Sequence, residues 1–377
     1  MKKILLVMPI STFEWGSKNA GGVDSVCQML IKFLSENPSE KFHYRVMAFD
    51  PFCSNEYTGE VIRLSGNLEV VTCPANEKRW GVKWPGVVST YLRVRAEIKC
   101  YQPDIVHSHI ASWLLGVPKS CRRILTLHSY KNICRKPVSW ANDFLYVELM
   151  PWMSNLYVDS YTCVSEMLKK ALVKNIDKPV TVIGNPIDDA YFVALDRRIE
   201  TGGVLRLVTC ALINRRKRID LAINLVKALK SAGKKVHLSI IGPNVDQAYF
   251  MELEKQVAEL ELNNEVSFLE RLNRGEIIRE YQSADIGVFF SEQETFGLAP
   301  LEMLATGLPL LTTEVGILAE RREAFQRLEV EYVNTDTQVR AIEKLQEVNS
   351  VEAHRYLEVE FSAASVVSAY EALYTES

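Results

Sequence analysis

The sequence predicts an α/β protein built from two domains, each with a parallel β-sheet. The chain has 377 residues, which is too long for one ordinary hydrophobic core and indicates two domains. In both halves short apolar runs alternate with longer stretches of helical periodicity, a pattern typical of parallel sheets covered by helices on both faces. Turn-forming residues are concentrated between Gly184 and Gly203, so we expect Rossmann-type domains over residues 1–190 and 191–377.

The apolar runs give the expected strands in chain order. The first half has seven, at Ile4–Pro9, Tyr44–Phe49, Leu68–Thr72, Ile105–His107, Ile124–Leu127, Thr162–Val164 and Val180–Ile183. The second half has six, at Leu205–Thr209, Val236–Ile241, Val266–Leu269, Ile286–Phe290, Leu308–Thr312 and Leu328–Val333. Ligands of such sheets bind beyond the carboxyl ends of the strands, so we expect the functional site in a cleft between the domains.

Helical periodicity fills the segments between these strands. In the first half it indicates helices at Val23–Leu34, Val87–Ile98 and Glu166–Val173. In the second half it indicates helices at Ile219–Lys230, Gln247–Leu260, Arg274–Ser283 and Ala299–Thr306. A last helix is expected at Ser362–Tyr374, and its return to the first domain is left open.

Composition excludes several classes of protein. The net charge of −3 argues against a nucleic-acid partner, which would normally require a basic chain. No apolar run reaches the ~20 residues that span a bilayer, and the apolar stretch near Met1 lacks a signal-peptide cleavage site, so we interpret it as a buried strand. Eight cysteines at irregular spacings predict reduced thiols and a cytoplasmic location.

The two halves differ in charge and in aromatic content. Residues 1–200 carry 25 Lys and Arg against 20 Asp and Glu, a net of +5, whereas residues 201–377 carry 19 against 27, a net of −8. All six tryptophans lie in the first half. This asymmetry is expected of two domains that bind different partners.

The clearest chemical signal is the run SEQETFGLAPLE from Ser291 to Glu302, which directly follows an expected strand. Gly297 allows a close approach to the backbone there, and a helix begins near Leu298. Free N–H groups at a helix start bind anions, assisted by the helix dipole. Glu294 and Glu302 are either ligand-binding carboxylates or a loop residue and a solvated helix residue, and the apolar neighbours of Glu302 favour an inward orientation.

These residues resemble the retaining glycosyltransferases of family 4, which have the GT-B fold of two facing Rossmann-like domains with a cleft between them. Most of the chain contributes to the resemblance. Its motifs are Glu294-x7-Glu302 with Phe296-Gly297 inside it, Ala305-x-Gly307-x-Pro309, Gly21-Gly22, Asp104–His109, Thr126–His128, Cys163–Glu166, Asn185–Asp188, Val266–Leu269 and Ala284–Ile286.

The resemblance implies an enzyme that moves a sugar from a nucleoside-diphosphate sugar to a hydroxyl of a glycan or lipid-linked glycan, as in cell-surface polysaccharide assembly. It implies no cofactor and no required metal, and the sequence has no Asp-x-Asp motif for a divalent ion. An acceptor-binding first domain and a nucleotide-sugar-binding second domain are expected. Two alternatives stay open: another GT-B activity such as a UDP-sugar epimerase, and a non-catalytic protein that binds a nucleotide or a glycan.

The resemblance also assigns roles to individual residues. Glu294 and His109 are expected to be catalytic and to hold the donor sugar from the two domains, while Glu302 suits the ribose hydroxyls because a carboxylate accepts two hydrogen bonds. The expected donor-binding set is completed by Lys217, Arg216, Arg215, Thr295, Phe296, Gly297, Leu298, Gly21, Gly22 and Asn185.

One position departs from the family pattern. Leu212 stands where the family often has an arginine that holds the diphosphate, and whether Arg215 or Arg216 replaces that cation stays open. The alternative is a basic helix start without a ligand, but cations at a helix start oppose the helix dipole.

Three histidines require separate consideration. His107 and His109 alternate along a strand end, and we expect them to point to opposite faces. Together with His128 they raise the possibility of a metal site, which the sequence disfavours because no carboxylate or cysteine pattern accompanies them. We therefore expect His107 and His128 to be structural.

Two segments of the first half are strongly basic. Residues 78–101 carry six basic residues against one acid, with Trp80 and Trp84 among them, and residues 117–136 carry six and no acid. Basic residues interleaved with aromatic and apolar ones suit an anionic bilayer, so we expect peripheral binding at the inner face of the cell membrane. A packed helix at Val87–Ile98 with solvated cations is the compatible alternative.

Overall fold

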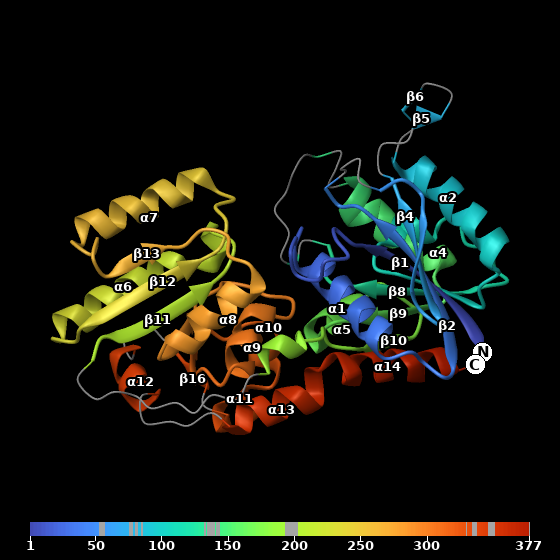
Figure 1. Ribbon diagram of the computed structural model, residues 1–377. Helices are drawn as coiled ribbons and strands as arrows, with labels where there is room; N and C mark the ends of the chain where they lie inside the picture. Colours follow the sequence, from blue (N-terminus) through green and yellow to red (C-terminus); the bar gives the residue numbers. More distant parts are fainter. Residues whose placement is uncertain are drawn as a thin grey trace. The chain divides into compact units, whose positions relative to one another are not determined.

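The computed structural model describes residues 1–52, 57–74, 78–79, 82–83, 86–131, 133, 140, 144–192, 203–328, 330–333, 338–345 and 351–376. The chain divides into two compact units: a first unit of Met1–Pro186 with Ala363–Ser377, and a second unit of Ile187–Ser362. Each unit has its own β-sheet with helices on both faces, which is the fold class that the sequence predicts (Figure 1).

The sheet of the first unit has the strand order β10-β9-β8-β7-β1-β2-β4-β3, in which only β3 runs antiparallel to its neighbour. A two-stranded pair, β5 (Lys78–Arg79) and β6 (Val82–Lys83), lies apart from it. The edge strand β3 has no buried residue, so it lacks the apolar run by which the other strands could be predicted. The eight strands are β1 (Lys2–Pro9), β2 (Phe42–Phe49), β3 (Val61–Ser65), β4 (Leu68–Cys73), β7 (Ile105–Ser108), β8 (Arg122–Leu127), β9 (Ser160–Cys163) and β10 (Val180–Val182).

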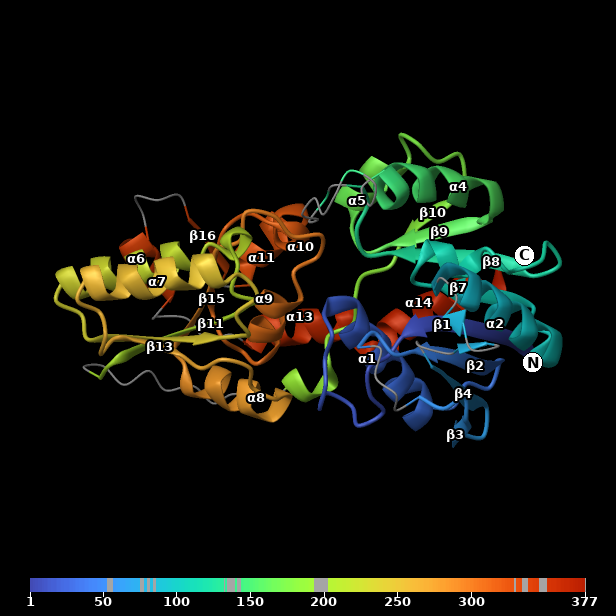
Figure 2. The same ribbon diagram turned by 90° about the horizontal axis from the view of Figure 1, so that it is seen from above.

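Helices cover both faces of this sheet. The helices α1 (Gly22–Glu36) and α14 (Ala363–Thr375) pack against each other on one face, while α2 (Gly86–Tyr101) and α4 (Met150–Tyr157) lie on the other (Figures 1 and 2). The last helix of the chain therefore belongs to the first unit, where Lys2 Nζ donates to the Tyr374 carbonyl over 3.2 Å. The shorter helices are η1 (Ala111–Leu114), η2 (Phe144–Leu149), α5 (Glu166–Leu172) and η3 (Asp189–Tyr191), the last of which opens the second unit.

The sheet of the second unit is parallel throughout, with the order β13-β12-β11-β14-β15-β16. Its core includes Leu238, Ile240, Ile286 and Val288, all fully buried. All six expected strands are present, although the last four in chain order are shorter than expected. They are β11 (Leu205–Cys210), β12 (Val236–Ile241), β13 (Val266–Phe268), β14 (Ile286–Phe289), β15 (Leu310–Thr312) and β16 (Val330–Tyr332).

The helices of the second unit also lie on both faces. Figure 2 shows α6 and α7 on one side of the strands and α8 on the other. The bounds are η4 (Arg215–Lys217), α6 (Ile219–Ser231), α7 (Gln247–Glu259), α8 (Arg274–Ser283), α9 (Leu298–Ala305), α10 (Gly316–Glu320), α11 (Arg322–Arg327), α12 (Gln338–Leu345) and α13 (Val351–Phe361).

Each sheet has one point at which the strand order reverses. In the first unit the chain adds β2 on one side of β1 and later adds β7 on the other side. In the second unit it adds β12 on one side of β11 and later β14 on the other. The loops that leave the carboxyl ends of such a strand pair diverge and open a crevice, which is where open α/β sheets bind their ligands.

Candidate active site

The reversal point of the second sheet brings together a lysine and a glutamate. Lys217 ends the short helix η4 after β11, and Glu294 lies in the loop after β14. Lys217 Nζ donates to Glu294 Oε1 over 2.6 Å, and each side chain is 11% exposed. Ser291 Oγ donates to the same oxygen over 2.6 Å, and the ammonium lies 5.0 Å from the centre of the Phe289 ring. The pair is therefore fixed on both sides by neighbouring groups.

The glycine that follows Glu294 starts a helix. Gly297 has φ of 95° and is the N-terminal cap of α9, a left-handed conformation that favours glycine. No side chain caps this helix, so the N–H groups of its first turn, beginning at Leu298, are available to an anion. The structure thus places the expected anion site within the same loop as Glu294.

Two further residues of this loop take different positions. Phe296 is 2% exposed, its ring packs 5.5 Å from the Phe361 ring, and its carbonyl accepts from the Ile317 N–H over 2.9 Å. A ligand could therefore use only the backbone N–H of Phe296. Thr295 is half-buried beside it.

Glu302 lies one turn into α9 and faces inward. Burial and, second, the negative charge of Asp188 raise the pKa of its carboxyl to about 7. Asp188 itself pairs with Arg274 on α8. The neighbours of Glu302 include the phenols of Tyr191 and Tyr281, whose pKa values burial and the Glu302 charge raise. A carboxyl group in this environment gains from hydrogen-bond donors on a ligand.

The basic residues around η4 do not act alike. Arg215 is exposed, and its guanidinium group pairs with Glu252 of α7. The backbone carbonyl of Arg216 accepts from the Glu292 N–H over 2.8 Å, which ties η4 to the loop after β14. Arg218, which the sequence did not single out, adopts φ of 44° as the N-terminal cap of α6 and pairs with Asp220. The basic residues therefore precede the helix rather than begin it.

Three histidines form one cluster in the first unit. His107 is held at Nδ1 by the Tyr374 hydroxyl and at Nε2 by the Thr126 hydroxyl, each over 2.6 Å. His109 stacks between His107 and His128, with ring centres 5.2 and 5.1 Å away, and its Nδ1 lies 2.8 Å from Nε2 of His128. Burial lowers the pKa of His107 to about 3 and of His128 to about 4, so both rings are neutral at pH 7.

The cluster corrects one prediction. We expected His107 and His109 to point to opposite faces, and this was wrong, because residues two apart in a strand share a face. The rings bond to one another and to hydroxyls, and among the described residues no group of three potential ligands is arranged to hold a metal ion.

The loop after β1 carries the glycine pair. Gly21, with φ of 139°, caps α1 and Gly22 begins it; both are exposed, and a Cβ at either would meet no atom within 4 Å. Asp24, which sequence reasoning missed, is 3% exposed and accepts from Ser11 N–H, Ser11 Oγ and Ala20 N–H. Its signal in the sequence was an acid in the first turn of a helix that starts at a glycine pair. Asp24 therefore shapes the loop that presents the glycines.

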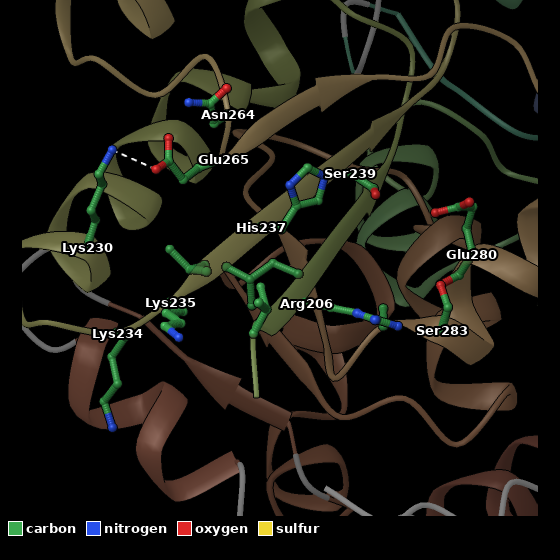
Figure 3. A pocket seen from close by; sticks show the side chains of 14 residues that line it. Arg206, Lys230, Lys234, Lys235, His237, Ser239, Asn264, Glu265, Glu280 and Ser283 are labelled. Atoms are coloured by element: carbon green, nitrogen blue, oxygen red, sulfur yellow. Dashed lines mark hydrogen bonds and ion pairs between the residues drawn. The ribbon is translucent and has the colours of Figure 1, made fainter. Parts of the chain in front are cut away.

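A pocket of about 630 Å³ lies elsewhere in the second unit, at the amino ends of β11 and β12 (Figure 3). One of its lysines, Lys230 in the last turn of α6, pairs with Glu265 over 2.6 Å and donates to the Glu261 carbonyl. This pocket is at the opposite end of the strands from Lys217 and Glu294, so we do not assign it to the candidate active site.

Two family models match the chain. Residues 20–191 match "Glycosyltransferase Family 4" and residues 203–357 match "Glycosyl transferases group 1". The chain therefore belongs to the family 4 glycosyltransferases of group 1. A curated relative, glycogen synthase of Mycobacterium tuberculosis, is 26% identical over 239 residues, which cover 59% of this chain and 55% of the relative. The match thus spans about half the length of that enzyme.

Solved structures resemble the whole chain. Sucrose-phosphate synthase from Thermosynechococcus elongatus aligns with a TM-score of 0.75 and 16% identity over 100% of both chains. Anabaena HepE, solved in complex with UDP-glucose, aligns with a TM-score of 0.67 and 15% identity over 100% of both chains. These likenesses show that the fold is GT-B.

Proposed function

We propose that the protein is a retaining glycosyltransferase that moves a sugar from a nucleoside-diphosphate sugar to a hydroxyl of a glycan or lipid-linked glycan. The observation that carries the proposal is the Lys217–Glu294 pair at the reversal point of the second sheet, beside the uncapped start of α9. Family membership supports the same reaction class. The setting that we propose is the assembly of a cell-surface polysaccharide.

The chemistry needs a stabilised leaving group. A nucleoside diphosphate departs with negative charge, and Lys217 offers an ammonium group in a partly desolvated position. The N–H groups at Gly297 and Leu298 add hydrogen bonds from a helix start. Both devices act on charge that grows as the bond to the sugar breaks, so they stabilise the transition state more than the ground state.

The two glutamates have separate roles in this proposal. Glu294 holds hydroxyls of the donor sugar, because its second oxygen is left to a ligand when Lys217 and Ser291 bond to Oε1. Glu302 binds the ribose hydroxyls, which supply the hydrogen-bond donors that its buried carboxyl needs.

In this proposal the first unit binds the acceptor and makes one contact to the donor sugar. We propose that the first unit binds the acceptor, that the second unit binds the nucleotide sugar, and that His109 contacts the donor sugar. Gly21 and Gly22 sit at the start of α1 with open space around them, which suits a close approach by a ligand. We propose that Asn185, which is 7% exposed, also belongs to the donor-binding set.

Donor turnover without acceptor tests the function. The purified protein is incubated with UDP-glucose, the ligand of HepE, and in parallel with GDP- and ADP-glucose, and released nucleotide is measured. A glycosyltransferase is expected to hydrolyse one donor slowly. An epimerase would change the sugar with the nucleotide still attached, and a pure binding protein would gain thermal stability with nucleotide but release none.

A matched pair of variants ties the turnover to the site. Lys217→Ala removes the cation beside Glu294, whereas Lys255→Ala removes an exposed cation that pairs with Glu259 on the surface of α7. Loss of nucleotide release in the first variant alone supports the proposal, and equal rates in both would contradict it.

A further inference from the structure

The two faces of the second sheet differ in polarity near the start of β11 and β12. On one face, alternate residues of both strands belong to the apolar core that α6 and α7 complete: Leu205, Leu207, Val236 and Leu238. The residues between them point to the opposite face. They include Arg206, His237 and Ser239, and the strand register places Arg206 beside His237. Central strands of a parallel sheet are normally apolar on both faces, so packing alone does not explain these polar side chains.

The pocket of about 630 Å³ lies on this polar face (Figure 3). Arg206 lines it from β11, His237 and Ser239 line it from β12, and Glu280 and Ser283 line it from the end of α8. Its volume is within the range of about 300–1,000 Å³ that is typical of small-molecule sites. The polar side chains of the sheet therefore face a space that a ligand can enter.

The pocket carries positive charge, although the second half of the chain is acidic. Arg206 and three lysines line the pocket against only two carboxylates, those of Glu265 and Glu280, which gives a net charge of +2 with His237 neutral. Residues 201–377 as a whole have a net charge of −8. A basic hollow in an acidic domain attracts anions to that position in particular.

Two of these cations have no partner within the fold. Lys230 pairs with Glu265 over 2.6 Å, and Lys234 has a carboxylate of α12 at 3.6 Å. The guanidinium group of Arg206 and the ammonium group of Lys235 form no ion pair or hydrogen bond with any residue that the structure describes. Their charges are therefore available to a ligand.

We propose that this pocket binds a phosphate monoester whose organic part carries hydroxyl groups, such as a phosphorylated sugar. A phosphate monoester has a charge of about −1.5 to −2 at pH 7, which matches the net charge of the pocket. Arg206 and Lys235 donate hydrogen bonds to the phosphate oxygens. His237, Ser239 and Asn264 also line the pocket, and their side chains can exchange hydrogen bonds with hydroxyl groups.

This pocket is separate from the candidate active site. Arg206 lies near the start of β11, whereas Lys217 follows the end of the same strand. A ligand of the pocket can therefore bind while a nucleotide occupies the active site. Binding in the pocket does not depend on the proposed function.

Calorimetric titration of the full chain with glucose 6-phosphate tests the site. The titration is made in the presence of excess UDP, so that a phosphate position beside Lys217 is already taken. We expect glucose 6-phosphate to bind at one site, inorganic phosphate to bind there more weakly, and glucose not to bind. The affinity is expected to fall as salt is raised. Absence of binding by both phosphate compounds at millimolar concentration would overturn the proposal, and so would binding that excess UDP abolishes.

Charge variants locate the binding. Arg206→Gln and Lys235→Gln are each expected to weaken the binding of glucose 6-phosphate about tenfold, the usual effect of losing one charge-assisted hydrogen bond. Both side chains are exposed, so the fold should tolerate the changes. The control Lys255→Gln removes an exposed cation of α7 outside the pocket and is expected to leave the affinity unchanged. Unchanged affinity in the double variant Arg206→Gln with Lys235→Gln would refute the assignment.

A neutral variant separates a pocket from a basic surface. Ser239→Phe fills space at the sheet without changing the charge and is expected to abolish binding. Thermal unfolding shows whether this variant folds, and if it does not, Ser283→Trp at the exposed wall is measured instead. Retained affinity in the folded variant would show that surface charge alone holds the anion and would contradict the pocket. Equal affinity for inorganic phosphate and glucose 6-phosphate would contradict the contacts to hydroxyl groups.

Discussion

Lys217 Nζ and Glu294 Oε1 lie 2.6 Å apart, although the two residues are 77 positions apart in the sequence. Lys217 follows β11, and Glu294 follows β14. The loops meet because β11 and β14 are neighbours at the reversal point of the strand order. Each side chain is largely shielded from water, so their interaction is screened less than a surface ion pair would be. The carboxylate thus holds the ammonium in place before any ligand arrives.

Removing either member of this pair should reduce turnover strongly. Lys217→Ala and Glu294→Ala are each expected to lower the rate of nucleotide release by about 10²–10³, the range found when one positioned group in an electrostatic site is lost. The measurement is the initial rate at saturating donor. Near-normal turnover in Glu294→Ala would mean that the site has been assigned to the wrong residues.

A control must show that these variants still fold, because each substitution leaves a largely buried charge without its partner. Thermal unfolding of Lys217→Ala, Glu294→Ala and the double variant provides the control. If the pair acts only through its mutual bond, the double variant should unfold at a temperature closer to wild type than either single variant does.

Nucleotide binding should depend on pH through Glu302. Burial and the charge of Asp188 raise the pKa of this carboxyl to about 7, so in the free protein it is about half protonated at pH 7 and mostly protonated at pH 6. The ribose hydroxyls bind best to the carboxylate, which accepts two hydrogen bonds, so binding favours loss of the proton. Affinity for UDP is therefore expected to fall as pH drops below about 7, approaching tenfold per pH unit.

Calorimetric titration with UDP between pH 5.5 and 8.5 measures this dependence. Glu302→Gln keeps the shape of the side chain but cannot ionise, so it should bind more weakly at pH 8 and lose the decline at low pH. A decline that persists in Glu302→Gln would assign the titration to another group. Because UDP itself titrates near this range, only the difference between the two proteins is interpreted.

The fold could be predicted from the sequence more fully than the geometry of the site, and the reasons are physical. The buried strands are visible as runs such as Ile4–Pro9, because burial on both faces demands consecutive apolar residues. The edge strand β3 was missed because Arg63 interrupts its short apolar run. The return of α14 to the first unit could not be decided, since periodicity shows that a helix has an apolar face but not what that face packs against.

The sequence predicted residues of the candidate site only where they belong to a recognisable motif. Glu294 and Lys217 were singled out by the resemblance to the family, yet nothing in the sequence says that their side chains bond to each other. The three basic residues of η4 read alike in sequence, and only the fold turns Arg215 toward α7.

Turnover should not require a metal ion. Lys217 and the first N–H groups of α9 already place positive charge where a diphosphate would be stabilised. Excess EDTA is therefore expected to leave the rate of nucleotide release nearly unchanged. If EDTA abolished nucleotide release and Mg²⁺ or Mn²⁺ restored it, a divalent ion would stabilise the diphosphate in place of Lys217.

The structure narrows the surface through which the first unit could bind a membrane. No helix within the described residues is long and apolar enough to cross a bilayer. In segment 117–136, the Arg122 side chain donates to the Leu373 carbonyl, and Arg123 pairs with Asp159, which offsets its charge. The helix α2 buries Thr90, Val94 and Ile98 and exposes Arg95 and Lys99. Trp80, Trp84, Arg135 and Lys136 lie outside the described residues.

Peripheral binding to an anionic bilayer through the exposed side of α2 remains our last prediction. Each basic residue near such a surface contributes about 1 kcal/mol, so a few of them give reversible binding. In sedimentation with vesicles, the wild-type protein is expected to pellet with phosphatidylserine but not with phosphatidylcholine alone, and to be released as salt is raised. Arg95→Glu with Lys99→Glu should weaken pelleting, whereas the control Lys235→Glu with Lys255→Glu, which makes the same charge change on exposed residues of the second unit, should not. Equal recovery in the supernatant with both kinds of vesicle would end this prediction and favour a soluble acceptor.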